Sequence, residues 1–187
     1  MGVDLDKVQD YTVITIYDRT NNKQVYKDRF NKLEWPYQKA KIIESAKHYN
    51  DALVVLDATG LGDPIADDLI RAGIAIEPFK LTNTTKKEII EKMSIWIDQH
   101  KISMINLPET ITEFTSFTYD VSSTGRIMYN APVGFHDDIV ISHCLAVSGL
   151  FPIPRGVKTE EKTKIQEIYE AQKRGQREDP YIDYEAV

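Results

Sequence analysis

A continuous apolar run, Ala52-Leu-Val-Val-Leu56, constrains the fold of this chain more than any other feature. A strand that is apolar at every position has no side that faces water, so it lies at the centre of a sheet that helices cover on both faces. Segments with helical character flank the run, beginning near Pro36 and near Ile65. Asp57 ends the run. The pattern therefore predicts an α/β domain.

The remaining segments predict a mixed sheet. Strand-like segments, most of them rich in β-branched and aromatic residues, occur at 2–8, 11–17, 24–30, 74–79, 102–105, 112–119 and 126–130. The first three form an antiparallel meander, because Asn21-Asn22 supplies a turn. The segments at 112–119 and 126–130 form a long hairpin with Gly125 in its loop.

Two further helices are expected after the central strands. The first begins at Thr84, where Thr85 and Glu88 have the spacing of a capping box, and it buries a stripe that includes Met93 and Trp96. The second covers residues 139–150 and is almost wholly apolar or small, as expected of a buried helix. Strand–helix alternation after a meander predicts a mixed sheet with helices on both faces.

Composition limits the classes of function. The 187 residues include 23 basic and 29 acidic side chains, a net charge of −6, so a simple electrostatic coat for nucleic acid is not expected. An enzyme that holds cations in an acidic site and meets nucleic acid with a local basic patch remains possible. The single cysteine, Cys144, excludes an intramolecular disulfide. No apolar run approaches the length of about 18 residues that a membrane-spanning helix needs.

The character of the chain changes near its end. Residues 155–187 carry dense charges of both signs and few apolar residues. We therefore predict one domain over residues 1–154, followed by a charged C-terminal tail over 155–187 that is partly helical or disordered.

Acidic residues occupy three positions where an ionised group is costly. Asp4 lies between Val3 and Leu5 in the first strand, and Asp57 ends the most apolar strand. Asp137 and Asp138 open the most apolar helix. Carboxylates near a core need a partner, and converging carboxylates with few basic neighbours are what hard divalent cations require. The pattern predicts a site for two such ions, which together can hydrolyse a phosphodiester.

Each of these residues also has an ordinary structural interpretation. Asp137 can cap a helix, Asp57 can lead into a turn, and Asp4 can lie on the surface. His136 can be a site acid or base, a metal ligand or a structural histidine. The segment Gly60-Leu-Gly62 is not a phosphate-binding loop, because no Lys-Ser/Thr pair follows it.

Three motifs resemble the nuclease domain of the large terminase subunit of tailed bacteriophages, in the ribonuclease H-like superfamily. They are Gly2-Val-Asp-Leu-Asp6, Leu56-Asp-Ala-Thr-Gly-Leu-Gly-Asp63 and Tyr129-Asn-Ala-Pro-Val-Gly-Phe-His-Asp-Asp138. The likeness covers about residues 2–150 in the same order.

The resemblance implies a ribonuclease H-like mixed sheet and a metal-dependent endonuclease that cleaves concatemeric viral DNA during genome packaging. It implies two Mg²⁺ or Mn²⁺ ions bound by Asp4, Asp57 and Asp138, with Asp137 as the competing ligand. Successive helical residues point about 100° apart, so sequence does not decide between Asp137 and Asp138. His136 matches a site position in some relatives, and Asp63 could contribute through the outer shell.

The resemblance also implies partners. They are double-stranded DNA, a packaging ATPase domain in cis that these 187 residues do not contain, the portal and the small terminase subunit, with no membrane. The expected location is the host cell cytoplasm, not the mature virion. Phosphate contacts are expected at Lys80, Lys86, Lys87 and Arg126, for which simple solvated charge is the alternative. The alternative function is a stand-alone nuclease similar to Holliday-junction resolvases.

Overall fold

The sheet of this domain has five strands in the spatial order β3-β2-β1-β4-β5. The structure is a computed structural model that describes residues 1–150 except 7–9, 61, 122–126, 131 and 133–135. The strands are β1 (Gly2–Asp4), β2 (Thr12–Asp18), β3 (Lys23–Phe30), β4 (Val54–Asp57) and β5 (Ile76–Phe79). The first three pair in antiparallel fashion, whereas β1, β4 and β5 run parallel. The predicted meander followed by parallel strands is confirmed.

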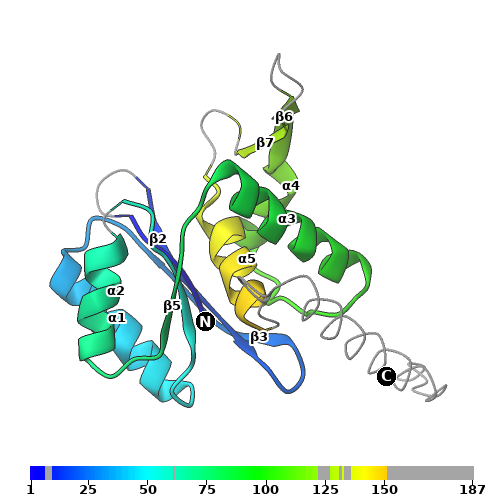
Figure 1. The fold of residues 1–187 in the computed structure, drawn as a ribbon. Coiled ribbons are helices and arrows are strands. Elements are labelled where there is room, and N and C mark those ends of the chain that lie inside the picture. The colour runs from blue at the N-terminus through cyan, green and yellow to red at the C-terminus, as the bar shows by residue number, and fades with distance from the viewer. Residues whose placement is uncertain (7–9, 61, 122–126, 131, 133–135, 151–187) are drawn as a thin grey trace, which may run out of the picture. The chain divides into compact units, whose positions relative to one another are not determined.

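Helices cover both faces of this sheet (Figure 1). The helices are α1 (Trp35–His48), α2 (Gly62–Arg71), α3 (Asn83–Asp98), α4 (Pro108–Ser116) and α5 (Asp138–Leu150). Side chains alternate along β4: Val54 and Leu56 pack with residues of α1 and α2, whereas Val55 packs with residues of α3 and α5. Val54, Val55 and Leu56 are therefore apolar in succession because the strand is buried on both sides, whereas Leu53, before the strand, is 40% exposed.

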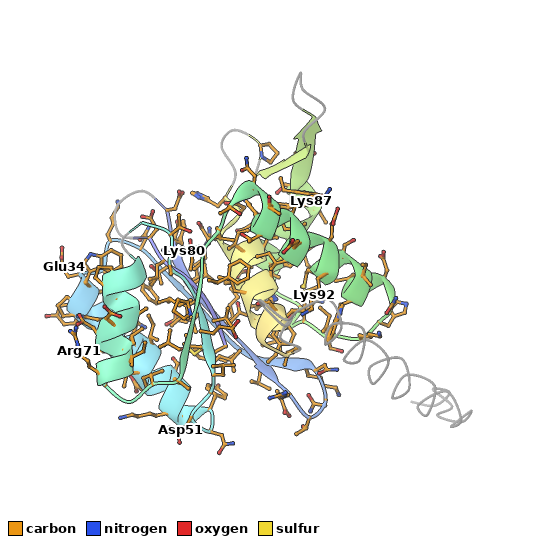
Figure 2. All side chains as sticks on the ribbon, viewed as in Figure 1. Glu34, Asp51, Arg71, Lys80, Lys87 and Lys92 are labelled. Atoms are coloured by element: carbon orange, nitrogen blue, oxygen red, sulfur yellow. The ribbon has the colours of Figure 1, made fainter. Side chains whose placement is uncertain are left out.

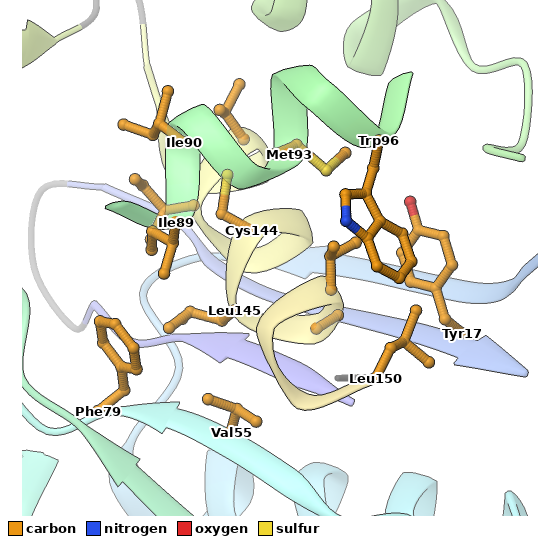
Figure 3. Close-up of a cluster of buried hydrophobic side chains, with 14 residues drawn as sticks. Tyr17, Val55, Phe79, Ile89, Ile90, Met93, Trp96, Cys144, Leu145 and Leu150 are labelled. Atoms are coloured by element: carbon orange, nitrogen blue, oxygen red, sulfur yellow. The ribbon is translucent and has the colours of Figure 1, made fainter. Parts of the chain in front are cut away.

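Helix α5 is the centre of the core on the face of the sheet that α3 and α5 cover. Almost all of its residues are buried, and it lies against β1 and β2 on one side and α3 on the other. Figure 3 shows Ile89, Met93 and Trp96 of α3 above Cys144 and Leu145 of α5, with Val55 and Phe79 below. This packing fixes the position of the N-terminal end of α5, where the acidic pair lies.

Gly2 allows α5 to approach β1 closely. A Cβ atom built at this residue would lie 2.1 Å from the backbone oxygen of Ser142 and 2.3 Å from the backbone nitrogen of Ala146. Both atoms belong to helix backbone, so they cannot move aside as a flexible side chain can. Beside this contact, the Thr15 and Ser142 hydroxyl oxygens lie 2.8 Å apart and join β2 to α5.

The segment before the hairpin differs from expectation. Residues 108–116 form helix α4, not the first hairpin strand, and β6 (Thr118–Val121) begins only at Thr118 and pairs with β7 (Ile127–Asn130). Pro108 begins this helix, and the Thr112 hydroxyl donates to the Pro108 carbonyl oxygen 2.9 Å away. The threonines that suggested a strand thus bond back to the helix backbone.

Two smaller predictions also need correction. Residues 102–105 form no strand, and Ser103 makes a single parallel bridge to Lys23 at the sheet edge. The cap of α3 is Thr82, which exchanges hydrogen bonds with Thr85, so the capping box lies three residues earlier than the predicted Thr85–Glu88 pair.

Two predicted features lie in residues that the structure does not describe. The charged tail at 155–187 and Arg126 lie outside the described residues. Within the described part of the chain, no helix has both the length and the apolar character needed to cross a bilayer.

Candidate metal centre

Asp4 and Asp57 end neighbouring parallel strands at the same edge of the sheet. Val3 of β1 pairs with Leu56 of β4, and each aspartate follows one position later. Val3 and Leu56 both pack toward α1 and α2, so the aspartates, by strand alternation, lie on the opposite face, which α5 covers. The sheet therefore places two carboxylates side by side beneath the start of α5.

Asp138 supplies a third carboxylate from the first residue of α5. Its side chain is 9% exposed, and its Oδ2 accepts a hydrogen bond from the Tyr11 backbone nitrogen at 3.3 Å. Burial is the main reason that the pKa of Asp138 is raised to about 6, and the charges of Asp10 and Asp137 raise it as well. The hydrogen bond from Tyr11 and the nearby His136 lower it.

The charges of neighbouring groups also act on Asp4. Burial raises the pKa of the Asp4 carboxyl well above its usual range, and the charges of Asp57, Asp138 and Asp137 raise it further. The Lys86 ammonium acts in the opposite direction. The structure thus brings together all four aspartates that sequence singled out, and it leaves Asp4 with more negative charge around it than positive.

Asp57 is held in place by a short turn. Its Oδ1 accepts a hydrogen bond from the Thr59 backbone nitrogen at 2.9 Å. The Thr59 hydroxyl in turn accepts from the Leu81 backbone nitrogen at 3.0 Å, which ties the turn to the segment before α3. Burial raises the pKa of Asp57, whereas the bonds from Thr59 and Leu81 and the charge of Lys86 lower it.

Glu113 of α4 fixes the N-terminal end of α5. One of its carboxyl oxygens, Oε1, accepts hydrogen bonds from the backbone nitrogens of Ile139 at 2.5 Å and Val140 at 3.1 Å. Burial raises the pKa of Glu113 to about 7, although these bonds and Arg29 lower it. A side chain from outside α5 therefore satisfies the first free amides of the helix that carries Asp138.

Asp10 also lies at the cluster, although the sequence patterns did not point to it. Ligand atoms of Asp10, His136 and Asp138 all lie within 4.8 Å of one another. His136 Nδ1 is 2.8 Å from Asp10 Oδ1 and 3.7 Å from Asp138 Oδ2. The meander contains the signal that could have found it: β2 begins where β1 ends, so residues just before β2 lie beside Asp4.

Asp137 differs from Asp138 because its carboxylate forms an ion pair with Lys86. Lys86 Nζ lies 2.7 Å from Asp137 Oδ2, and the two side chains are 22% and 28% exposed. Lys86 was predicted to contact DNA phosphate, and the structure places it among the aspartates. Lys87 lies 3.6 Å from Glu91, and Lys80 is exposed after the end of β5 (Figure 2). The side chain of Asp63 lies outside the described residues.

The donor set suits hard divalent cations. Asp4, Asp57 and Asp138 offer carboxylate oxygens from three elements, and Asp10 and His136 extend the cluster toward solvent. Mg²⁺ and Mn²⁺ prefer such oxygen ligands, and Mn²⁺ also accepts imidazole nitrogen. Carboxyl groups whose pKa values are raised by one another's charge gain most from a bound cation, because it removes that repulsion.

Comparisons with known proteins agree on one family. The family model described as the terminase RNaseH-like domain matches residues 1–148. The large terminase subunit of Thermus virus P23-45 is 30% identical over 149 residues, which are 79% of this chain and 31% of that protein. The chain therefore spans about a third of the length of this relative.

Solved structures agree with the sequence match. The large terminase nuclease from thermophilic phage G20c with bound magnesium is 30% identical with a TM-score of 0.74, over 79% of this chain and 78% of that one. The nuclease domain from Thermus phage P74-26 is 28% identical with a TM-score of 0.73, over 84% and 81%. This chain therefore belongs to the terminase RNase H-like domain family.

Proposed function

We propose that this chain is the nuclease domain of a large terminase subunit and that it hydrolyses phosphodiester bonds of double-stranded DNA with divalent metal ions. The observation that carries the proposal is the convergence of Asp4, Asp57 and Asp138 from two strand ends and a helix start. The G20c nuclease, 30% identical, was solved with bound magnesium, and related structures of it hold cobalt or zinc.

In this proposal each site residue has a defined role. Asp4, Asp57 and Asp138 would hold two Mg²⁺ or Mn²⁺ ions, and Asp10 and His136 would complete the outer side of the cluster. Bound ions of this kind supply an activated water and stabilise the leaving oxygen. Asp10, whose Oδ1 lies 2.8 Å from His136 Nδ1, would orient the imidazole beside Asp138.

DNA approach depends on local positive charge, since the chain as a whole is acidic. Lys80 and Lys87 flank the start of α3 (Figure 2), and the segment before α3 is tied through Leu81 and Thr59 to the turn that holds Asp57. Both lysines would contact phosphates, as would Arg126, which lies outside the described residues. Contacts to phosphate alone imply little sequence specificity and strong dependence on salt. Binding that did not weaken on raising the salt concentration would contradict this part.

The wider assembly is part of the same proposal. In a packaging machine the domain would act beside an ATPase domain in cis, with a portal and a small terminase subunit, in the host cell cytoplasm. It would cut concatemeric viral DNA at the start and end of packaging.

The test is cleavage of supercoiled plasmid with and without Mn²⁺. We expect the parent protein to nick and linearise plasmid only with metal, and Asp57→Asn to lose cleavage while it keeps its fold. Asp98→Asn is the matched control, because Asp98 is exposed at the far end of α3.

Two results would contradict the proposal. Metal-dependent cleavage by purified Asp57→Asn equal to that of the parent would exclude this site. Absence of cleavage by the parent, together with no Mn²⁺-induced rise in its thermal stability, would exclude a metal centre.

A further inference from the structure

Lys86 and Asp137 form an ion pair inside the acidic cluster, and the pair joins two elements that are distant in sequence. Their side-chain atoms lie 2.7 Å apart, and both side chains are largely covered. Charge-assisted hydrogen bonds of this length are among the strong ones. The pair links the first turns of α3 to the residue that precedes α5.

The position of Lys86 is built into the local structure. Its backbone nitrogen donates to the Thr82 carbonyl oxygen at 2.8 Å, and the Thr85 hydroxyl donates to the Lys80 carbonyl oxygen at 2.6 Å. Leu81 is tied through Thr59 to the turn that holds Asp57. The same turn therefore places both Asp57 and the lysine that approaches Asp137.

The two adjacent aspartates have different surroundings. Asp138 is 9% exposed and lies with His136 and Asp10, whereas the Asp137 carboxylate is already bonded to a cation. The Lys86 ammonium also acts on Asp4 and Asp57, since its positive charge lowers the pKa of both carboxyl groups.

We propose that Lys86 is a positioning residue that neutralises Asp137 and holds it away from the metal ions, so that Asp138 is the α5 carboxylate that binds them. The inference rests on the proposed metal-dependent nuclease function. It assigns Lys86 a role inside the site, not on the DNA-binding surface.

The test measures Mn²⁺ affinity by calorimetry in four variants: Asp137→Asn, Asp138→Asn, Lys86→Met and Lys86→Arg. Asp137→Asn keeps the stoichiometry of the parent but binds Mn²⁺ about three- to tenfold more weakly, because the unpaired Lys86 ammonium adds one positive charge near the ions, whereas Asp138→Asn loses binding. Lys86→Met binds Mn²⁺ about three- to tenfold more tightly, because an unpaired carboxylate adds one negative charge near the ions. Its cleavage rate nevertheless falls, because Asp137 now competes with Asp138.

Rescue distinguishes this role from a structural one. Lys86→Arg keeps the charge and restores parental Mn²⁺ affinity, and adding Asp137→Asn to Lys86→Met removes the gain in affinity. A destabilised site would lose affinity and cleavage together, which would overturn the proposal.

Other outcomes would overturn it as clearly. Loss of Mn²⁺ binding in Asp137→Asn would make Asp137 a ligand. A higher KM for DNA in Lys86→Met with unchanged Mn²⁺ affinity would make Lys86 a phosphate contact. Failure of the parent protein to bind Mn²⁺ at all would instead refute the proposed function, so the two failures are distinguishable.

Discussion

Asp4 and Asp57 lie one position beyond the Val3–Leu56 pair, at the carboxyl ends of two adjacent parallel strands. This relationship places two carboxylates on the face that α5 covers, where burial raises the pKa of both groups and the charges of Asp57, Asp138 and Asp137 raise that of Asp4 further. The cluster therefore lowers the stability of the metal-free fold while it creates a site for cations.

Replacing Asp4 separates the destabilisation of the metal-free fold from the binding of cations. We expect Asp4→Asn to unfold at a higher temperature than the parent in EDTA at pH 7, because a carboxyl with a raised folded-state pKa opposes folding when ionised. With Mn²⁺, only the parent gains stability. The check is thermal denaturation with Asp98→Asn as the control. A lower unfolding temperature in EDTA would contradict the account.

Asp10 tests the outer side of the site. Asp10→Asn keeps the size of the side chain but removes a charge 2.8 Å from His136. We expect Mn²⁺ affinity to fall about tenfold, the usual loss when a group that orients a ligand is removed. Calorimetry measures it, and an affinity equal to that of the parent would remove Asp10 from the site.

Gly2 tests the close approach of α5 to β1. Gly2→Ala should lower the free energy of unfolding by about 3 kcal/mol, because its Cβ would meet helix backbone at 2.1 Å. Gly73→Ala is the matched control: it has open space but a φ of +81°, and should cost about 1 kcal/mol. Urea denaturation that gave Gly2→Ala the smaller effect would refute the packing argument.

His143 makes stability depend on pH. It is fully buried in α5, its Nδ1 lies 2.7 Å from the Tyr17 hydroxyl, and burial lowers its pKa to about 3. As pH falls from about 6.5 toward 3, the unfolded chain binds a proton that the folded chain excludes, so stability falls by up to about 1.4 kcal/mol per pH unit.

The variant His143→Gln isolates this effect. Other groups titrate equally in both proteins, so the parent should lose stability more steeply than the variant between pH 6 and pH 5. Urea denaturation at both values measures the difference. Equal slopes would mean that His143 becomes protonated in the folded state.

Local sequence patterns predicted β4 and α5, the two elements that are buried along nearly their whole length. The apolar helix expected at 139–150 appears as α5, and the strand expected at 52–56 appears as β4 over Val54–Asp57, with Leu53 exposed before it. Helix α4 was missed because its threonines favour a strand by propensity, whereas the contact of Glu113 with α5 depends on tertiary structure.

Part of the site could be predicted because it lies at the ends of elements that the sequence shows. Strand ends and a helix start are visible in sequence, and they located Asp4, Asp57 and the pair at 137–138. The meander could have placed Asp10 beside Asp4, but the contacts of Asp10 with His136 and of Lys86 with Asp137 span 126 and 51 residues, so no local pattern shows them.

The most direct measurement of the central claim is anomalous diffraction from crystals soaked in Mn²⁺. We expect anomalous density against the carboxylates of Asp4, Asp57 and Asp138, with Asp137 still bonded to Lys86. Density elsewhere on the domain, with none among these three aspartates, would contradict it.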